Sequence, residues 1–306
     1  LPITLGSLAT SVAGLIDATF LQSRVGDVLR EAPQRLLAAY PGQIPDTYRE
    51  NPQAIPTFLY GCYTLAMTIY LLVPGVTQAF GTSALPNVTA AYARGNKREL
   101  RSKLEAVVRV TALFCFPAGV GMASLSFPLT QLLYGHGEST PIIARCLFLL
   151  GTASLPVGGA ALPVKLLLGA MAIKLGANWV LCGIPELNIQ GAAVGTLLCY
   201  LFLTVFQFYC LRRAAGVPLS IGQVFLRPLA CALLCGAGAR LAWGILERIF
   251  PAGRWGEALA VLGATAFGAA VYTAALLLLR GINKSDLQSL PMGQKIAKML
   301  EKQGWI

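Results

Sequence analysis

EALAVLGATAFGAAVYTAALLLL, the 23-residue stretch Glu257–Leu279, decides the fold of this chain. After the initial glutamate it carries no charged side chain. About 20 apolar residues are enough for an α-helix to cross the hydrocarbon core of a bilayer. Lipid offers no partner for backbone N–H and C=O groups, so such a segment must pair them internally as a helix. The stretch therefore predicts a transmembrane helix.

The composition of the whole chain agrees with this prediction. The chain has 306 residues, of which 56% are hydrophobic and 12% are charged, whereas soluble domains carry about 25% charged residues. The net charge is +11, but the basic residues cluster in short connectors between apolar runs. No basic soluble domain is present, so we do not expect a nucleic-acid partner. The chain begins at Leu1 without a basic segment before its first apolar run, so we expect no signal peptide and a start inside a longer protein.

Seven further segments are long and apolar enough to span a membrane. We therefore predict an all-α membrane protein whose residues 1–281 form a transmembrane lobe of eight spans. The second span should continue as an amphipathic helix to about Ala93. Frequent small residues such as Gly191-Ala192-Ala193 and Gly236-Ala237-Gly238 predict close helix packing. The expected spans are 2–21, 58–80, 104–125, 141–161, 162–181, 191–211, 222–246 and 257–279.

The distribution of Lys and Arg predicts the orientation of the spans. Basic residues gather between the second and third spans (94–103), between the sixth and seventh (Arg212, Arg213) and after the eighth. The connectors after the third and fifth spans contain neither Lys nor Arg. By the positive-inside rule the basic connectors face the cytoplasm. Eight spans satisfy this alternation, so we expect a multi-pass protein of the cell membrane with both ends of this chain cytoplasmic.

Residues 282–306 form a separate segment in this scheme. Ile296, Met299 and Leu300 recur at helical spacing, and three lysines occupy the other side. This pattern predicts a cytoplasmic amphipathic helix that lies on an anionic membrane surface. A frayed tail is the alternative.

Ionisable residues inside the spans are the candidate functional residues, because they are costly in lipid. Asp17 lies within the first span; it predicts a cation or proton site, or else a residue that reaches out to the membrane surface. Lys174 lies about 18 Å into the fifth span, and Asn178 follows one turn later on the same face. Lys174 could contact an anionic substrate such as a diphosphate, or Asp17, or form a charge pair that fixes helix packing.

The sequence contains no recognisable catalytic arrangement. His136 is the only histidine, and no metal-ligand spacing or phosphate-binding glycine motif is present. We therefore expect a protein that is not an enzyme, has no catalytic residues and needs no organic cofactor.

Several stretches resemble the family of stage V sporulation protein B and the lipid II flippases, within the multidrug, oligosaccharidyl-lipid and polysaccharide (MOP) exporter superfamily. The most specific is the run through Lys174 and Asn178 to Gly183–Thr196. The others are Pro2–Gly6 with Leu15-Ile16-Asp17, Ser83–Val88 with Ala93–Asn96, Phe127–Gly135, and Ser285–Pro291. Together these stretches cover nearly the whole chain.

The resemblance implies a fourteen-helix flippase in two lobes, of which this chain would supply helices 7–14. It further implies a sodium site, with Asp17 as the carboxylate, Asn178 as the amide and Thr196 as the hydroxyl. The chain departs from the family pattern in two places. Cys182 stands where a second acid is expected, which leaves proton coupling or no coupling open. Residues 150–163 are shorter than usual, either by deletion or because residues are absent there.

The function implied is a flippase for undecaprenyl-diphosphate-linked sugars, which serve peptidoglycan, spore cortex or another polysaccharide. Its expected partners are the lipid-linked sugar diphosphate, the bilayer and a missing N-terminal lobe, and Lys174 is the candidate contact in the substrate cavity. The alternatives are a cation-coupled multidrug exporter of the same superfamily and a membrane scaffold that does not transport.

Overall fold

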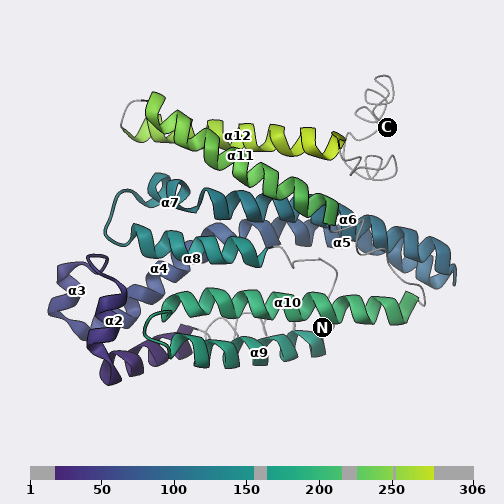
Figure 1. Cartoon of the computed structure of the whole chain (residues 1–306). Helices are drawn as coiled ribbons and strands as arrows, with labels where there is room; N and C mark the ends of the chain where they lie inside the picture. The colour runs from purple at the N-terminus through teal and green to yellow at the C-terminus, as the bar shows by residue number, and fades with distance from the viewer. Residues whose placement is uncertain (1–17, 155–163, 216–225, 251–252, 279–306) are drawn as a thin grey trace. The chain divides into compact units, whose positions relative to one another are not determined.

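The computed structural model describes residues 18–154, 164–215, 226–250 and 253–278, and every regular element in these ranges is a helix (Figure 1). The prediction of an all-α membrane protein is confirmed. In chain order the elements are a helix at 18–31, α2 (Pro33–Ala39), α3 (Asp46–Glu50), the 3₁₀ turn η1 (Pro52–Ala54), α4 (Ile55–Tyr70), α5 (Leu72–Ala93), α6 (Lys97–Ser124), α7 (Ser126–Tyr134), α8 (Thr140–Ala153), α9 (Val164–Cys182), α10 (Ile189–Ala215), α11 (Arg227–Ile249) and α12 (Arg254–Leu278).

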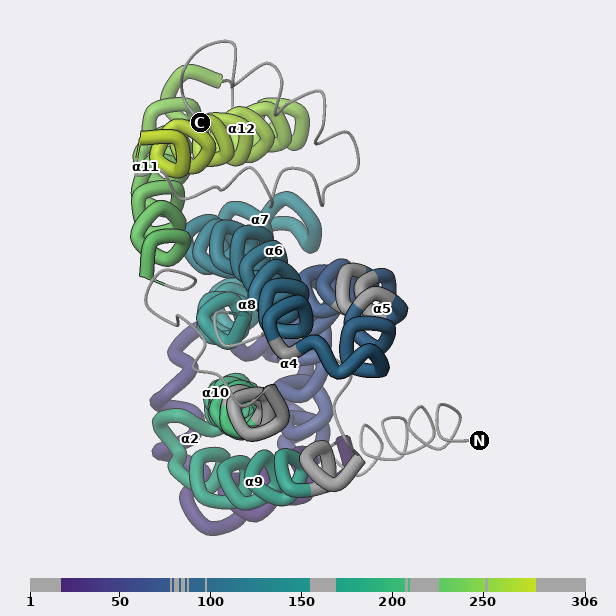
Figure 2. The backbone as a smooth tube through the Cα atoms, turned by 90° about the vertical axis from the view of Figure 1, so that its right-hand side faces the viewer, coloured from purple at the N-terminus to yellow at the C-terminus, as the bar shows by residue number. Residues whose placement is uncertain are grey.

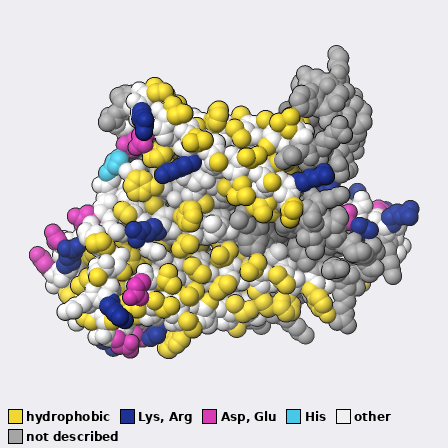
Figure 3. Space-filling view, viewed as in Figure 1, with side chains coloured by type: hydrophobic (Ala, Val, Ile, Leu, Met, Phe, Trp, Pro, Cys, Tyr) yellow, Lys and Arg dark blue, Asp and Glu magenta, His cyan; other side chains and the backbone are white. Residues whose placement is uncertain are grey.

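Five of the described helical stretches are long and apolar enough to cross a membrane: Pro52–Thr77, Arg98–Ser124, Ile189–Phe206, Arg227–Ile249 and Arg254–Leu278. Two shorter apolar helices, Thr140–Ala153 and Gly169–Cys182, lie where further spans are expected. Large apolar side chains remain exposed on α11 and α12, as on the face shown in Figure 3. Such surfaces suit contact with lipid rather than water.

Several predicted features lie wholly or partly outside the described residues: most of the span at 2–21, the short junction at 155–163, the first residues of the span at 222–246, the last residue of the span at 257–279 and the whole amphipathic tail at 282–306. The eight-span lobe, its boundaries and the tail therefore remain predictions. Residues 18–31 continue as a helix beyond the expected end of the first span at residue 21.

The junction between α5 and α6 shows how the local sequence sets helix ends. Helix α5 continues to Ala93, as expected from the sequence, and Gly95 follows with a φ of +67° that favours glycine. Asn96 then caps α6, because its side-chain oxygen accepts a hydrogen bond of 3.1 Å from the backbone N–H of Glu99. Pro86 and Pro117 lie within α5 and α6, where proline removes a backbone donor.

The chain divides into two compact units. In the second unit, which holds most of α5 and all of α6, α11 and α12, helix α11 packs against both α6 and α12. Gly236 on α11 lies so close to Val120 and Ser124 on α6 that a β-carbon would clash at 2.5 Å. The small-residue stretch at 236–238 therefore brings these helices together, as the sequence predicts.

The first unit holds residues 1–72, 126–156 and 162–206. Within it, α8 packs against α4 and α7, and α9 lies beside α10 in both views of the chain (Figures 1 and 2). The α9–α10 approach is very close at Gly191, where a β-carbon would lie 2.7 Å from the backbone of Leu181. This unit contains the described candidate site residues.

Candidate functional site

The helix at 18–31 is anchored to α9 through Trp179. The rings of Phe20 and Trp179 lie 5.5 Å apart between centroids, and the Arg24 guanidinium lies 4.6 Å from the centre of the Trp179 ring. Arg24 Nε also donates a 3.2 Å hydrogen bond to the Trp179 carbonyl oxygen. Asp17 directly precedes this helix in the chain but lies outside the described residues. These contacts fasten the helix at 18–31 to Trp179, the residue that follows Asn178 on α9.

Asn178 is fully buried at the contact between α9 and α10. Its side-chain oxygen occupies the place that a β-carbon would take at residue 195, where the sequence has glycine. The amide of Asn178 therefore lies directly against the backbone of α10, one residue before Thr196. The structure brings these two predicted site residues together on adjacent helices.

Thr196 is also buried and links α10 to α4. Its Oγ1 donates a 3.0 Å hydrogen bond to the carbonyl oxygen of Ala192, which uses its only proton. The hydroxyl of Tyr63 on α4 lies 3.1 Å from the same Oγ1 and must therefore donate to it. This buried polar contact connects two helices of the first unit.

One turn along α9 and α10, a second set of polar groups lies on the same helix faces. Lys174 precedes Asn178 by four residues and is partly buried. It interacts electrostatically with Tyr200 on α10, which follows Thr196 by four residues. The ring of Tyr200 lies 6.1 Å from that of Tyr70 on α4. We call Tyr63, Lys174, Asn178, Thr196 and Tyr200 the polar file.

Part of the polar file lies in a helix that is long and apolar enough to cross a membrane, Ile189–Phe206. Thr196 and Tyr200 are seven and eleven residues past the first residue of α10, which corresponds to about 10 Å and 16 Å along the helix. In a hydrocarbon core about 30 Å thick that α10 entered at its first residue, Tyr200 would lie near the middle. Polar and ionisable groups at this depth face the protein interior or a wet cavity, and they mark pathways for ions and substrates.

The donors in the file match part of a sodium site. Amide and hydroxyl oxygens are the hard ligands that alkali cations prefer, and Asn178 and Thr196 supply one each. The polar file contains no carboxylate, and Asp17, the predicted carboxylate ligand, lies outside the described residues. At the position of the expected second acid, Cys182 is buried and offers a soft thiol. Among the described residues, no group of three or more His, Cys, Asp or Glu side chains could hold a metal ion.

Tyr63 and Tyr200 are members of the file that the sequence analysis missed. Each tyrosine lies in an apolar run, where an aromatic side chain is typical of a hydrophobic core. Tyr200 could have been found from its spacing, because it follows Thr196 by one helical turn. Tyr63 could not, because only the packing of α4 against α10 brings its hydroxyl to Thr196.

Comparison with known proteins confirms the family resemblance. Residues 60–147 match the family described as "Lipid II flippase MurJ". Two relatives come from Bacillus subtilis (strain 168). This chain is 26% identical to "Lipid II flippase MurJ" of that organism over 72% of this chain's length, and 26% identical to its "Stage V sporulation protein B" over 76% of this chain's length. It is also 23% identical over 80% of its length to "Uncharacterized membrane protein YabM" of the same organism.

The coverage of the relatives is partial. The matches cover 47%, 43% and 46% of YabM, the MurJ flippase and stage V sporulation protein B respectively, so the chain spans about half the length of these relatives. Of these three relatives, only the MurJ flippase has a name that states a transport activity.

Proposed function

We propose that this chain is one lobe of a MOP-superfamily flippase that moves undecaprenyl-diphosphate-linked sugar precursors across the cytoplasmic membrane by alternating access. The observation that carries this proposal is the polar file, three of whose members (Tyr63, Asn178 and Thr196) are buried between apolar helices, in a chain similar to lipid II flippases. A flippase must offer polar groups to a headgroup that cannot cross hydrocarbon unaided. The precursors would serve peptidoglycan, spore cortex or another polysaccharide.

Lys174 is the proposed contact for the headgroup. An ammonium near mid-membrane is costly unless it meets opposite charge or water. A diphosphate would supply that charge, and hydrogen bonds from a cation to phosphate oxygens are about twice as strong as neutral ones. The phenol of Tyr200, which interacts with Lys174, adds a donor of the kind that phosphate oxygens accept. The lipid tail would remain in the bilayer.

Asp17, Asn178 and Thr196 form the proposed cation site, with sodium as the candidate ion. One support is the close contact between Asn178 and Gly195, which directly precedes Thr196. The other is the set of contacts that hold the helix at 18–31, which follows Asp17 in the sequence, against Trp179. In this scheme Asp17 supplies the negative charge, and Tyr63 orients the Thr196 hydroxyl by donating to it. Because Cys182 replaces a hard ligand, we expect weaker sodium binding than an acid there would give.

The proposed membrane arrangement places both ends of the chain in the cytoplasm. The basic stretch at 94–103 lies at the α5–α6 junction, and a second basic pair, Arg212 and Arg213, lies near the end of α10. The partial coverage of the relatives is consistent with a second lobe elsewhere in the protein. We therefore propose that an N-terminal lobe of the same protein completes the transport path.

A cation-coupled multidrug exporter of the same superfamily is the second candidate. Three tyrosines (Tyr63, Tyr70 and Tyr200) lie in or beside the polar file, and aromatic surfaces suit flat organic cations. Lys174 opposes such a substrate, because two cations repel each other in a low-dielectric site. The charge at position 174 therefore distinguishes the two candidates.

The decisive experiment uses the full-length protein in sealed vesicles with headgroup-labelled lipid II. We expect the label to become accessible on the far side, and Lys174→Gln to slow its appearance at least tenfold. Lys103→Gln is the matched control, because Lys103 is exposed and lies outside the polar file. Failure of the wild-type protein to move the headgroup rejects the flippase. Export of organic cations that improves in Lys174→Gln would support the drug exporter, and no transport of either kind would leave a scaffold.

The cation site is tested separately by varying sodium in the same vesicles. We expect sodium to accelerate wild-type flipping and Asp17→Ala to abolish that dependence. If Asp17→Ala flips slowly but responds to sodium as the wild type does, Asp17 is not a ligand.

A further inference from the structure

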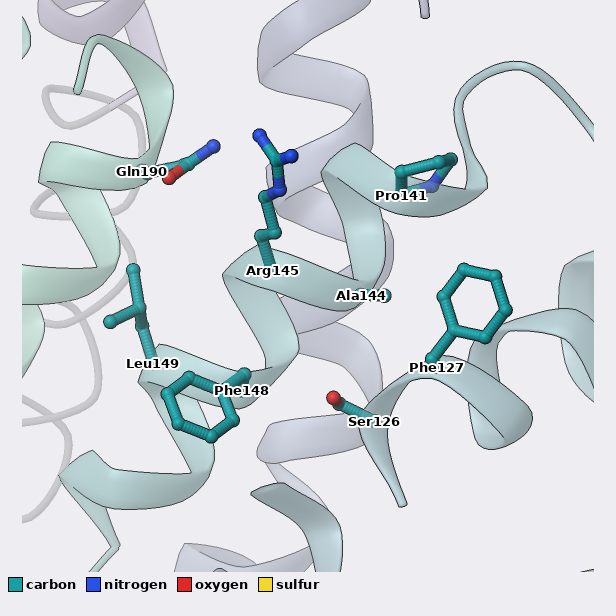
Figure 4. Close-up of a pocket in the computed structure, with 8 residues that line it drawn as sticks. All are labelled: Ser126, Phe127, Pro141, Ala144, Arg145, Phe148, Leu149 and Gln190. Carbon is teal, nitrogen blue, oxygen red and sulfur yellow. The ribbon is translucent and has the colours of Figure 1, made fainter. Parts of the chain in front are cut away.

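A second polar site lies in the first unit and shares no lining residue with the polar file. Helices α7 and α8 and the first turn of α10 line an open pocket of about 480 Å³, within the range of about 300–1,000 Å³ that small-molecule sites occupy. Figure 4 shows Arg145 of α8 and Gln190 of α10 extending toward each other, with the Phe148 ring away from them. The lining residues are Ser126, Phe127, Pro141, Ala144, Arg145, Phe148, Leu149 and Gln190.

The electrostatics of this pocket favour an anion. Arg145 is its only charged lining residue, and none of the eight is acidic. Arg145 is exposed, and within the described parts of the chain it forms no ion pair that would neutralise its charge. The guanidinium stays charged at every physiological pH and can bind phosphate through two parallel hydrogen bonds. The start of the 27-residue helix α10, where Gln190 lies, adds partial positive charge.

The position of the pocket along α8 favours an amphiphilic ligand. Arg145 is five residues past the first residue of α8, about 8 Å along the helix, so its long side chain can reach the headgroup layer. Phe148 and Leu149 come one turn further along the same helix, toward the middle of an apolar segment. Both contribute apolar surface to the pocket. The pocket is therefore cationic near the start of α8 and apolar further along the helix. A lipid whose headgroup lay near Arg145 would place its acyl chain along the apolar part.

We propose that this pocket binds the phosphate headgroup of an anionic phospholipid of the surrounding bilayer. Arg145 would bind the phosphate, Gln190 and Ser126 would hydrogen-bond its remaining oxygens or the glycerol, and Phe148 and Leu149 would contact the upper acyl chain. The proposal concerns residues outside the polar file, and it stands whether or not the protein is a flippase.

Native mass spectrometry of the full chain in detergent tests this proposal, with phosphatidylglycerol as the probe. We expect a saturable adduct that diacylglycerol and equimolar inorganic phosphate do not give. Arg145→Gln should lower the affinity about tenfold, because it removes a charge-assisted hydrogen-bond donor, and Arg145→Lys should retain part of it. Arg254→Gln is the matched control, since Arg254 is exposed at the start of α12 and lies outside the pocket; it should bind as the wild type does.

Each other outcome overturns the proposal. Equal binding of phosphatidylglycerol by the wild type and Arg145→Gln would show that Arg145 does not bind the phosphate. Equal binding of diacylglycerol by the wild type would show that the pocket recognises acyl chains alone. Binding of inorganic phosphate as tight as that of phosphatidylglycerol would show an anion site that does not select lipid.

A second measurement locates the bound lipid. A photoreactive phosphatidylglycerol should label a peptide that contains residues 141–149 in the wild type and in Arg254→Gln, and labelling there should fall in Arg145→Gln. Labelling confined to other peptides would place the lipid elsewhere and reject the pocket.

Discussion

At the scale of the residue, a glycine determines the geometry of the polar file. Asn178 is buried against the α10 backbone because Gly195 has no side chain there. Without this close approach, the amide of Asn178 could not lie next to Thr196 while both helices remain packed. The geometry of the polar file therefore depends on glycine at position 195 as well as on the polar side chains.

Gly195→Ala should destabilise the protein, because the new methyl group would overlap the Asn178 side-chain oxygen. Overpacking of this kind costs about 1–3 kcal/mol, so we expect a clearly lower melting temperature for the full chain in detergent. Gly176→Ala is the control on α9, since Gly176 is exposed and no atom lies within 4 Å of the added carbon. Equal melting temperatures for the two variants would mean that Asn178 does not occupy this contact.

Tyr63→Phe should remove one buried hydrogen bond while leaving the ring in place. Thr196 Oγ1 would lose its only described donor, at a cost of about 1 kcal/mol. We expect slower transport by the full-length protein and a small loss of thermal stability. Tyr60→Phe, one turn earlier on α4, is the comparison that should leave transport unchanged. If both variants transport alike, the Tyr63 hydroxyl does not serve the site.

At the scale of the element, the connector between the helix at 18–31 and α4 is folded rather than extended. It contains α2, α3 and η1, and Tyr40 at the end of α2 is almost completely buried. Burial raises the pKa of the Tyr40 phenol above its ordinary value near 10. The folded connector thus keeps Tyr40 protonated where an exposed phenol would ionise.

The shifted pKa of Tyr40 predicts a loss of stability in alkaline solution. Above about pH 10 an unfolded Tyr40 releases its proton while the folded one retains it, so the unfolded state gains stability as the pH rises. Below that pH both states are protonated, and Tyr40 adds no pH dependence. Melting temperatures between pH 8 and 11 should fall less steeply for Tyr40→Phe than for the wild type. Tyr48→Phe serves as the control, and an unchanged slope in Tyr40→Phe would argue against the burial of this phenol.

At the scale of the whole molecule, the proposed orientation has a direct test. Cysteines introduced at Glu138 and Lys103, in a background without native cysteines, should react differently with a membrane-impermeant maleimide. Glu138 follows α7 in a connector without Lys or Arg, whereas Lys103 lies in the basic stretch near the start of α6. We expect labelling of intact cells at 138 only and of permeabilised cells at both positions. The opposite pattern would invert the topology.

The length of the chain relative to its relatives bears on the proposed transport path. The chain spans about half of each of its relatives, so a transport path formed by two lobes would require residues beyond this sequence. The pocket at Arg145 differs in this respect, because all its lining residues belong to one compact unit.

The sequence by itself determined the fold class and the family resemblance. Long apolar runs permit only helices in lipid, and the sequence pattern also predicted that the helix now seen as α5 continues to about Ala93. It also singled out Lys174 and Asn178 as polar groups inside an apolar run, whereas Thr196 came only from the family resemblance. These features depend on composition and short-range spacing, which are readable without knowing the neighbours of a residue.

Only the tertiary structure decided which side chains meet. Tyr63 and Thr196 are 133 residues apart in the chain, yet their hydroxyls lie 3.1 Å from each other. Arg145 was overlooked in the sequence as one charge in an apolar helix, and only its neighbours on α7 and α10 show that it lines a pocket. The physical reason is that an apolar pattern fixes the secondary structure of a helix, whereas contacts between helices depend on long-range packing that no short window of sequence contains.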